Sequence, residues 1–157
     1  IDSVVDMYIL YEIIHDYDCG EGSFYMCVDF SENSKYEKLT FTSPWDFNWA
    51  YNDAPEGKYY AAAFADKSFV DQYGDRSNPW FIILMQEDWF QNAVKEKWTE
   101  MKKDDVLKNC ILEEKKMLKE YDKDLNKVEE WATACSEDLL SWIESMIYWL
   151  NDQWLIK

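Results

Sequence analysis

The chain has 157 residues with 32 acidic and 16 basic side chains, so its net charge at pH 7 is −16. This charge argues against nucleic acid and an anionic membrane surface as partners, because both are bound through clustered Lys and Arg. With 48% hydrophobic residues the chain can build the core of one domain, and no apolar run has membrane-spanning length.

The first half of the chain predicts a helix followed by a β-hairpin. Ser3 and Asp6 resemble a capping box, and apolar residues at helical spacing extend the helix to about His15. A loop with two glycines comes next and contains Asp18. Two short strands joined by a polar turn then indicate an antiparallel hairpin, with strands at 23–28 and 39–42.

The second half predicts four helices after an irregular stretch, at about 50–75, that we expect to pack across the domain. Asn78 caps the first helix, in which Pro79 takes the first position. The other helices are predicted at 88–101, from 104 or 105 to about 128, and at 136–154, the last two as an antiparallel pair. The second places four side chains on one side: Trp89, Phe90, Val94 and Trp98. The predicted fold is therefore α+β and mostly α, with a small antiparallel hairpin near the N-terminus.

The four cysteines, Cys19, Cys27, Cys110 and Cys135, include no C-x-x-C pair, which argues against structural zinc and thioredoxin-type chemistry. Four thiols are also too few to mark a disulfide scaffold in a chain of this length. Cys110 and Cys135 fall on apolar helical positions, so we expect buried free thiols there. The disulfide state and the redox compartment stay open.

Two polar motifs have structural interpretations. Residues 122–126 imitate half of an EF-hand loop, but Lys127 replaces the required Gly and Thr133 the bidentate Glu, so we expect a solvated helix face. His15 is the only histidine and lies beside two aspartates. It is either a general base oriented by an aspartate or a histidine at a helix C-terminus.

Two aspartates lie where a phosphotransferase needs carboxylates. Asp18 is in the glycine-bearing loop, and Asp46 follows the second strand of the hairpin. Kinases hold a catalytic Asp on a loop and a metal-binding Asp-Phe pair after a hairpin, and Asp46-Phe47 fits the second role by spacing. The kinase Asn five residues after the catalytic Asp is replaced by Ser23. Structural capping by the two aspartates is the alternative.

Four segments of the chain occur in the same order as the elements of a known family: 9–14 (ILYEII), 17–18 (YD), 23–26 (SFYM) and 43–49 (SPWDFNW). They resemble the helix, loop, aromatic strand and Pro-Trp-Asp-Leu/Phe-Asp motif of the spore coat protein H (CotH) kinase family. Residues 88–98 and 149–154 are also similar to the C-terminal region of that family. The resemblance covers nearly the whole chain, and residues 44–49 are its most specific part.

The resemblance implies the helical C-terminal lobe of an atypical protein kinase that uses ATP and Mg²⁺ to phosphorylate protein side chains. It implies Asp18 as the catalytic aspartate and Asp46, Asn48 and Ser23 as the metal positions. Asn48 replaces an aspartate of the family and Ser23 the usual Asn, and weaker ligands lower the affinity for Mg²⁺. Because only about 17 residues precede Asp18, we expect the N-terminal lobe with its phosphate-binding Lys to be missing and the fragment to be inactive alone.

The expected metal site depends on backbone geometry. Asp46 and Asn48 would share one face of an extended strand, and the loop of Asp18 would pack against its end. Oxygen ligands of this kind suit Mg²⁺, which usually needs substrate phosphates to complete its shell. We therefore expect an acidic pocket with weak metal affinity in the absence of nucleotide.

The acidic surface suits a basic protein substrate, and the resemblance makes a bacterial secreted or cell-surface setting, such as a spore coat, the expected location. The alternative function is a non-catalytic binding module, either a pseudokinase scaffold or a secreted carbohydrate or peptide binder. Four aromatic residues of the long loop would line its surface: Trp49, Tyr51, Tyr59 and Tyr60.

Overall fold

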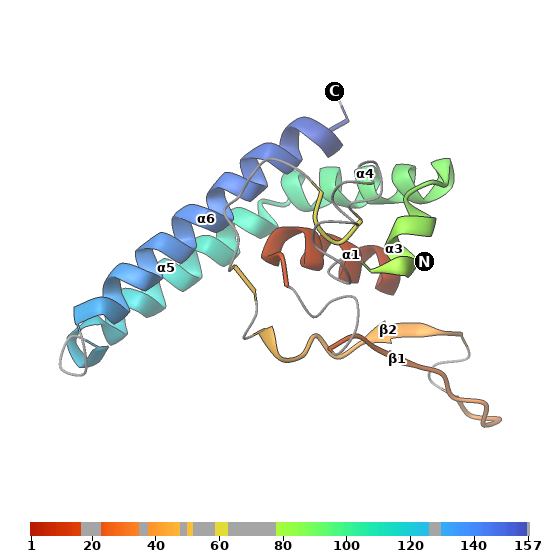
Figure 1. The fold of residues 1–157 in the computed structure, drawn as a ribbon, viewed down its shortest axis with the longest axis horizontal. Helices are drawn as coiled ribbons and strands as arrows, with labels where there is room; N and C mark the ends of the chain where they lie inside the picture. The colour runs from red at the N-terminus through yellow and green to blue at the C-terminus, as the bar shows by residue number, and fades with distance from the viewer. Residues whose placement is uncertain are drawn as a thin grey trace. The chain divides into compact units, whose positions relative to one another are not determined.

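Figure 1 shows the fold in a computed structural model, which describes residues 1–16, 23–34, 38–47, 50–51, 59–62, 78–125 and 130–156, with side chains for all of these except 118, 122–125 and 130–137. The described chain is mostly helical and contains a small two-stranded antiparallel sheet, as the sequence predicts. It divides into two compact units, residues 1–94 and residues 95–157. No described helix is long and apolar enough to cross a membrane.

Helix α1 (Asp2–Ile14) forms the centre of the first unit. Eight of its 13 residues are buried, on nearly every face, which is typical of a helix surrounded by other segments. The predicted capping box is wrong, because Ile1 takes the N-cap position and Ser3 lies inside the helix. The Ser3 hydroxyl instead accepts a hydrogen bond of 3.2 Å from the backbone N–H of Phe41, which joins the start of α1 to the hairpin.

The predicted hairpin is confirmed, with strands shorter than the sequence suggests. Strand β1 (Tyr25–Cys27) pairs antiparallel with β2 (Thr40–Thr42), and Met26 lies opposite Phe41. Phe41 is buried, and its ring centroid lies 6.3 Å from that of the fully buried Phe81. Phe41 thereby fixes the hairpin on the core of the first unit.

Helix α3 (Pro79–Leu84) begins as predicted. The Asn78 side chain accepts a hydrogen bond of 2.9 Å from the backbone N–H of Trp80, which satisfies one of the donors at the helix start. Phe81 is fully buried, with its ring centroid 5.2 Å from that of Tyr8 on α1. This contact places α3 against α1.

Helix α4 (Asp88–Lys103) confirms three of the four predicted core positions, since Phe90, Val94 and Trp98 are fully buried. The prediction for Trp89 is wrong, because 48% of the surface of this side chain is exposed. Adjacent residues point about 100° apart around a helix, so Trp89 cannot share the direction of Phe90.

The second unit contains the predicted antiparallel helix pair, which is confirmed. Helices α5 (Val106–Leu125) and α6 (Glu130–Trp154) lie side by side in Figure 1, and α6 begins earlier than the predicted residue 136. The ring of Trp154 packs edge-on against that of Trp98 at 5.2 Å, and the Nε1 of Trp98 donates a 3.0 Å hydrogen bond to Oδ1 of Asn151. Residues 122–125 belong to α5, in agreement with the helical interpretation of the EF-hand-like motif.

The surface of α5 departs from the prediction. Cys110 is an exposed free thiol instead of a buried one, and Leu112 is 54% exposed. A helix that packs on one neighbour buries only a stripe, so apolar spacing alone overstates its burial. Cys27 is a half-buried free thiol, whereas Cys19 and the side chain of Cys135 lie outside the described part of the chain.

Candidate functional site

Tyr11, in the C-terminal half of α1, contacts two segments that belong to the predicted site, one at Ser23 and one next to Asp46. The Tyr11 hydroxyl donates a hydrogen bond of 2.9 Å to the carbonyl oxygen of Ser23. The Tyr11 ring also packs edge-on against that of Phe47, with 6.3 Å between centroids. Since Tyr11 is only 1% exposed, one buried side chain contacts both Ser23, two positions before the hairpin, and Phe47, the neighbour of Asp46.

The backbone around Asp46 is strained. Ser43, Asp46 and Tyr51 have φ angles of 56°, 59° and 61°, in the left-handed region that costs a non-glycine residue about 1–2 kcal/mol. Such conformations persist where surrounding contacts hold them, and they cluster at functional sites. Here the N–H of Tyr51 donates a hydrogen bond of 2.9 Å to the carbonyl oxygen of Ile14, the last residue of α1.

Two of the four predicted site residues are described. Ser23 is buried and Asp46 is exposed, whereas Asp18 and Asn48 lie outside the described residues. The expected extended strand at Asp46 is wrong, because β2 ends at Thr42 and Asp46 adopts the left-handed conformation. Among the described residues, which do not include Asp18, no group of three or more His, Cys, Asp or Glu could hold a metal ion.

Glu12 is a buried carboxylate that the sequence analysis missed. It is fully buried, and its two oxygens accept hydrogen bonds from the backbone N–H groups of Tyr60, at 2.7 Å, and Ala62, at 2.9 Å. Burial raises the pKa of Glu12 to about 7, and the amide hydrogen bonds oppose that rise. Burial and the nearby Glu12 charge raise the pKa of Tyr8 well above its ordinary value. Glu12 therefore changes its charge near neutral pH.

His15 ends α1 in the left-handed conformation and stacks on Tyr60. Their ring centroids lie 4.5 Å apart at an interplanar angle of 11°, and both side chains are buried. This position fits the helix-terminus interpretation of His15. It also shows that the expected surface role of Tyr60 is wrong; Tyr51 and Tyr59 are half-buried, and Trp49 lies outside the described residues.

A sequence signal for Glu12 does exist. Tyr8, Glu12 and His15 are spaced four and three residues apart, so they share one face of α1, and most of their neighbours are apolar. A carboxylate on such a face must find hydrogen-bond donors if the face is buried. The sequence could not name these donors, because Tyr60 and Ala62 are 48 and 50 positions away.

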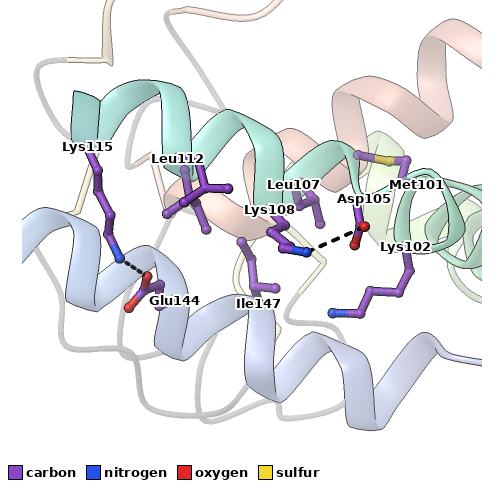
Figure 2. A pocket seen from close by; sticks show the side chains of 10 residues that line it. Met101, Lys102, Asp105, Leu107, Lys108, Leu112, Lys115, Glu144 and Ile147 are labelled. Carbon is purple, nitrogen blue, oxygen red and sulfur yellow. Dashed lines mark hydrogen bonds and ion pairs between the residues drawn. The ribbon is translucent and has the colours of Figure 1, made fainter. Parts of the chain in front are cut away.

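The second unit has a groove of about 260 Å³ between the end of α4, α5 and α6 (Figure 2). Apolar side chains such as Leu107 and Ile147 line it, and charged side chains surround them. Lys108 pairs with Asp105 at 3.6 Å, and both side chains are more than half exposed. Exposed pairs of this kind contribute little energy.

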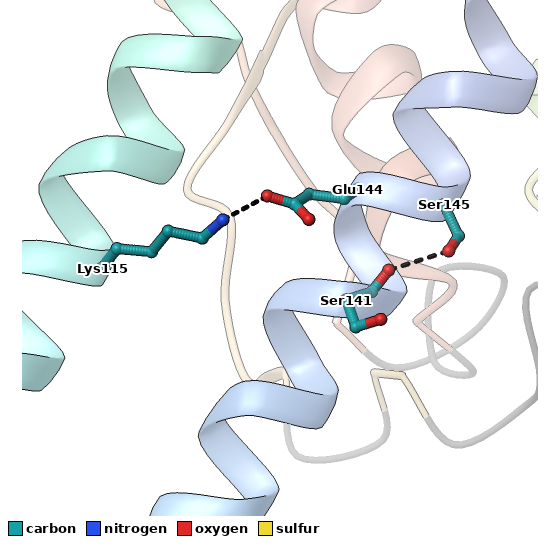
Figure 3. Close-up of polar contacts among 4 residues, drawn as sticks. All are labelled: Lys115, Ser141, Glu144 and Ser145. Carbon is teal, nitrogen blue, oxygen red and sulfur yellow. Dashed lines mark hydrogen bonds and ion pairs between the residues drawn. The ribbon is translucent and has the colours of Figure 1, made fainter.

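Figure 3 shows the second ion pair of this groove, between Lys115 on α5 and Glu144 on α6. On α6 the hydroxyl of Ser145 donates a hydrogen bond of 2.8 Å to the carbonyl oxygen of Ser141. The Lys115 and Glu144 side chains are 41% and 48% exposed. The ion pair that joins α5 and α6 at this groove is therefore exposed to solvent, as in an ordinary contact on a protein surface.

Comparisons with protein family models, curated proteins and solved structures find no match for this chain. Its fold class therefore follows from the structure alone, as a mostly helical chain with a small antiparallel sheet. The resemblance to the CotH kinase family stays a prediction made from the sequence segments.

Proposed function

We propose that the chain is the helical lobe of an atypical, CotH-like protein kinase, in which Asp18 positions the substrate hydroxyl and Asp46 holds Mg²⁺. The observation that carries this proposal is the strained backbone of Asp46. Contacts with α1 support it on both sides, from the Phe47 ring to Tyr11 and from the N–H of Tyr51 to the helix end. Backbone conformations that surrounding contacts maintain in this way cluster at active sites and ligand-binding sites.

Asp46 also has the chemistry that the role requires. Its side chain is exposed, so a hydrated cation can reach it, and carboxylate oxygens are preferred ligands of Mg²⁺. We assign Asn48 and Ser23 to the same metal, with the buried Ser23 as the less accessible ligand. The phosphates of ATP would complete the shell, so affinity for Mg²⁺ should depend on the nucleotide.

The proposed substrate is a basic protein that carries Ser or Thr. A net charge of −16 attracts such a protein over long distances and raises the rate of encounter. The family resemblance supports a bacterial secreted or cell-surface setting, including the spore coat, and transfer would require the N-terminal lobe of a kinase.

Calorimetric titration of the chain with ATP tests the metal assignment. We expect weak binding that requires Mg²⁺ and that falls about tenfold or more in Asp46→Ala, because this change removes a charged ligand. Asp104→Ala removes an equal charge from an exposed position outside the motif and should bind ATP as the wild type does. Binding that needs no metal, or that Asp46→Ala leaves unchanged, would contradict the assignment.

Phosphate transfer from labelled ATP to a Lys-rich peptide with Ser and Thr tests the activity. The assay uses the natural protein together with any kinase N-terminal lobe that it carries. Asp18→Ala and Asp46→Ala should each abolish transfer while Asp104→Ala retains it. Equal transfer by all variants would show that the aspartates are assigned wrongly.

A second candidate, a non-catalytic binding module, is favoured by exposed aromatic side chains in the first unit. Trp45, next to Asp46, is 61% exposed, and Trp80 on α3 is 49% exposed while its ring lies 6.4 Å from that of Phe41. Exposed aromatic rings can stack on sugars or peptides. Saturable quenching of Trp fluorescence by oligosaccharides, without a response to Mg²⁺ and ATP, would support this function over the first.

A further inference from the structure

The Glu12 carboxylate connects α1 to a segment far away in the sequence. Each of its oxygens accepts one backbone N–H of residues 59–62, from Tyr60 at 2.7 Å and from Ala62 at 2.9 Å. Hydrogen bonds to a charged acceptor in a buried site are stronger than neutral ones. The carboxylate therefore fixes both the position and the direction of this short backbone segment.

The fixed segment acts on the end of α1 through one ring. Tyr60 stacks on His15 with an angle of 11° between the rings, and His15 has φ 48° and ψ 51°. A histidine in this conformation needs support from its surroundings, because the region is unfavourable for residues other than glycine. The chain then leaves α1 through the fully buried Asp16, two positions before Asp18.

We propose that Glu12 is a positioning residue that acts through Tyr60 and His15 to fix the direction of the backbone at the end of α1, at His15 and Asp16. The significance of that direction for phosphate transfer rests on the proposed function. The contacts themselves do not, so the structural and the catalytic parts can be tested separately.

The positioning should depend on the charge of Glu12. The two amide hydrogen bonds favour the carboxylate, but burial disfavours its charge by more, so the pKa is raised on balance. Among the described residues, the titratable groups near Glu12 are Tyr8 on the same helix and Tyr60 on the bound segment, with Tyr59 near Tyr8 and His15 beyond the Tyr60 ring. Because burial beneath this segment raises the pKa of Glu12 to about 7, ionisation opposes that burial, so the arrangement should be tight below neutral pH and looser above it.

The single histidine makes the test direct, because its ring protons give an unambiguous NMR signal. In the wild type at pH 6, the ring current of Tyr60 should shift these protons upfield. In Glu12→Gln the shift should decrease, and amide exchange at residues 60 and 62 should accelerate about tenfold or more, since the Gln side chain has one acceptor oxygen for two N–H groups. The matched control Glu87→Gln changes an exposed Glu of the same unit and should leave both signals unchanged. A folded Glu12→Gln variant with wild-type signals would overturn the proposal.

The wild type provides a second test that does not require the variant to fold. On titration, the amide signals of residues 60 and 62 and the side-chain carboxyl carbon of Glu12 should move together with a midpoint near pH 7. Amide signals that stay constant while the carboxyl carbon titrates would overturn the proposal.

The kinetic test separates this inference from the proposed function. In the transfer assay, Glu12→Gln should lower kcat about tenfold with little change in KM for ATP, and the part of the pH profile near pH 7 should disappear. Equal kcat and an equal pH profile in the variant and the wild type would reject Glu12 as a positioning residue. A wild type that transfers no phosphate but shows the NMR behaviour would reject the kinase and retain the link from Glu12 to His15.

Discussion

In the first unit a carboxylate of α1 and the histidine at its end are buried, whereas in the second unit the charged pair that joins α5 and α6 is open to solvent. Glu12 is fully buried and His15 is 2% exposed. Lys115 and Glu144 join the helices of the second unit with side chains that are 41% and 48% exposed. Both arrangements connect distant parts of the chain, but their energetics differ.

This difference indicates which unit responds to its chemical environment. A buried group changes the free energy of unfolding when its charge changes, since no solvent screens it. An exposed pair is screened by water and salt, so its loss matters little. We expect the first unit to be sensitive to pH and the second to depend on apolar contacts such as Trp98 against Trp154.

The largest expected effect is the pH dependence that Glu12 gives to stability. Its pKa is about 7 in the folded chain and near 4.5 when unfolded, so between these values the folded state binds more protons. The free energy of unfolding should therefore fall as pH rises from 5 to 8, by roughly 2–3 kcal/mol from this group. Glu12→Gln should remove that contribution, as measured by urea unfolding at several pH values.

Glu144→Gln is the comparison from the second unit, and it should keep the pH dependence of the wild type. The prediction fails if Glu12→Gln and wild type show parallel curves of stability against pH.

An intermediate effect is expected from glycine at two left-handed positions, one in each unit. His15 and Asp105 have φ angles of 48° and 52°. Glycine relieves strain at both, but His15→Gly also removes a buried ring stacked on Tyr60. We expect His15→Gly to destabilise by about 1–2 kcal/mol and Asp105→Gly to stay within about 0.5 kcal/mol of the wild type. Thermal unfolding measures both, and equal effects would show that the stack contributes nothing.

The smallest effect is expected for the ion pair between α5 and α6. A double-mutant cycle of Lys115→Ala and Glu144→Ala should give a coupling energy below about 1 kcal/mol, which decreases further in high salt. Urea unfolding of the four proteins measures it. A larger, salt-independent coupling would mean that the pair is shielded and that the contrast between the units is weaker than proposed.

The sequence by itself determined the local elements. Asn78 followed by Pro79 predicts the start of α3, because the side-chain acceptor and the fixed φ act within one turn. Apolar spacing predicted the helix pair, and two β-rich runs predicted the hairpin, since both depend on near neighbours. The sequence also selected Asp46 through its motif, but the left-handed φ of Asp46 and the contact of Phe47 with Tyr11 on α1 could not be read from that motif.

The tertiary structure decided where the polar groups of α1 find their partners. Ser3 was predicted to cap its own helix but accepts a hydrogen bond from Phe41, 38 positions away. Glu12 lies on a face that could have been solvated, and Tyr60 was predicted to be exposed; both are buried, and the N–H of Tyr60 donates a hydrogen bond to Glu12. Burial of a polar side chain depends on a donor brought close by the whole fold, and local spacing carries no information about that donor.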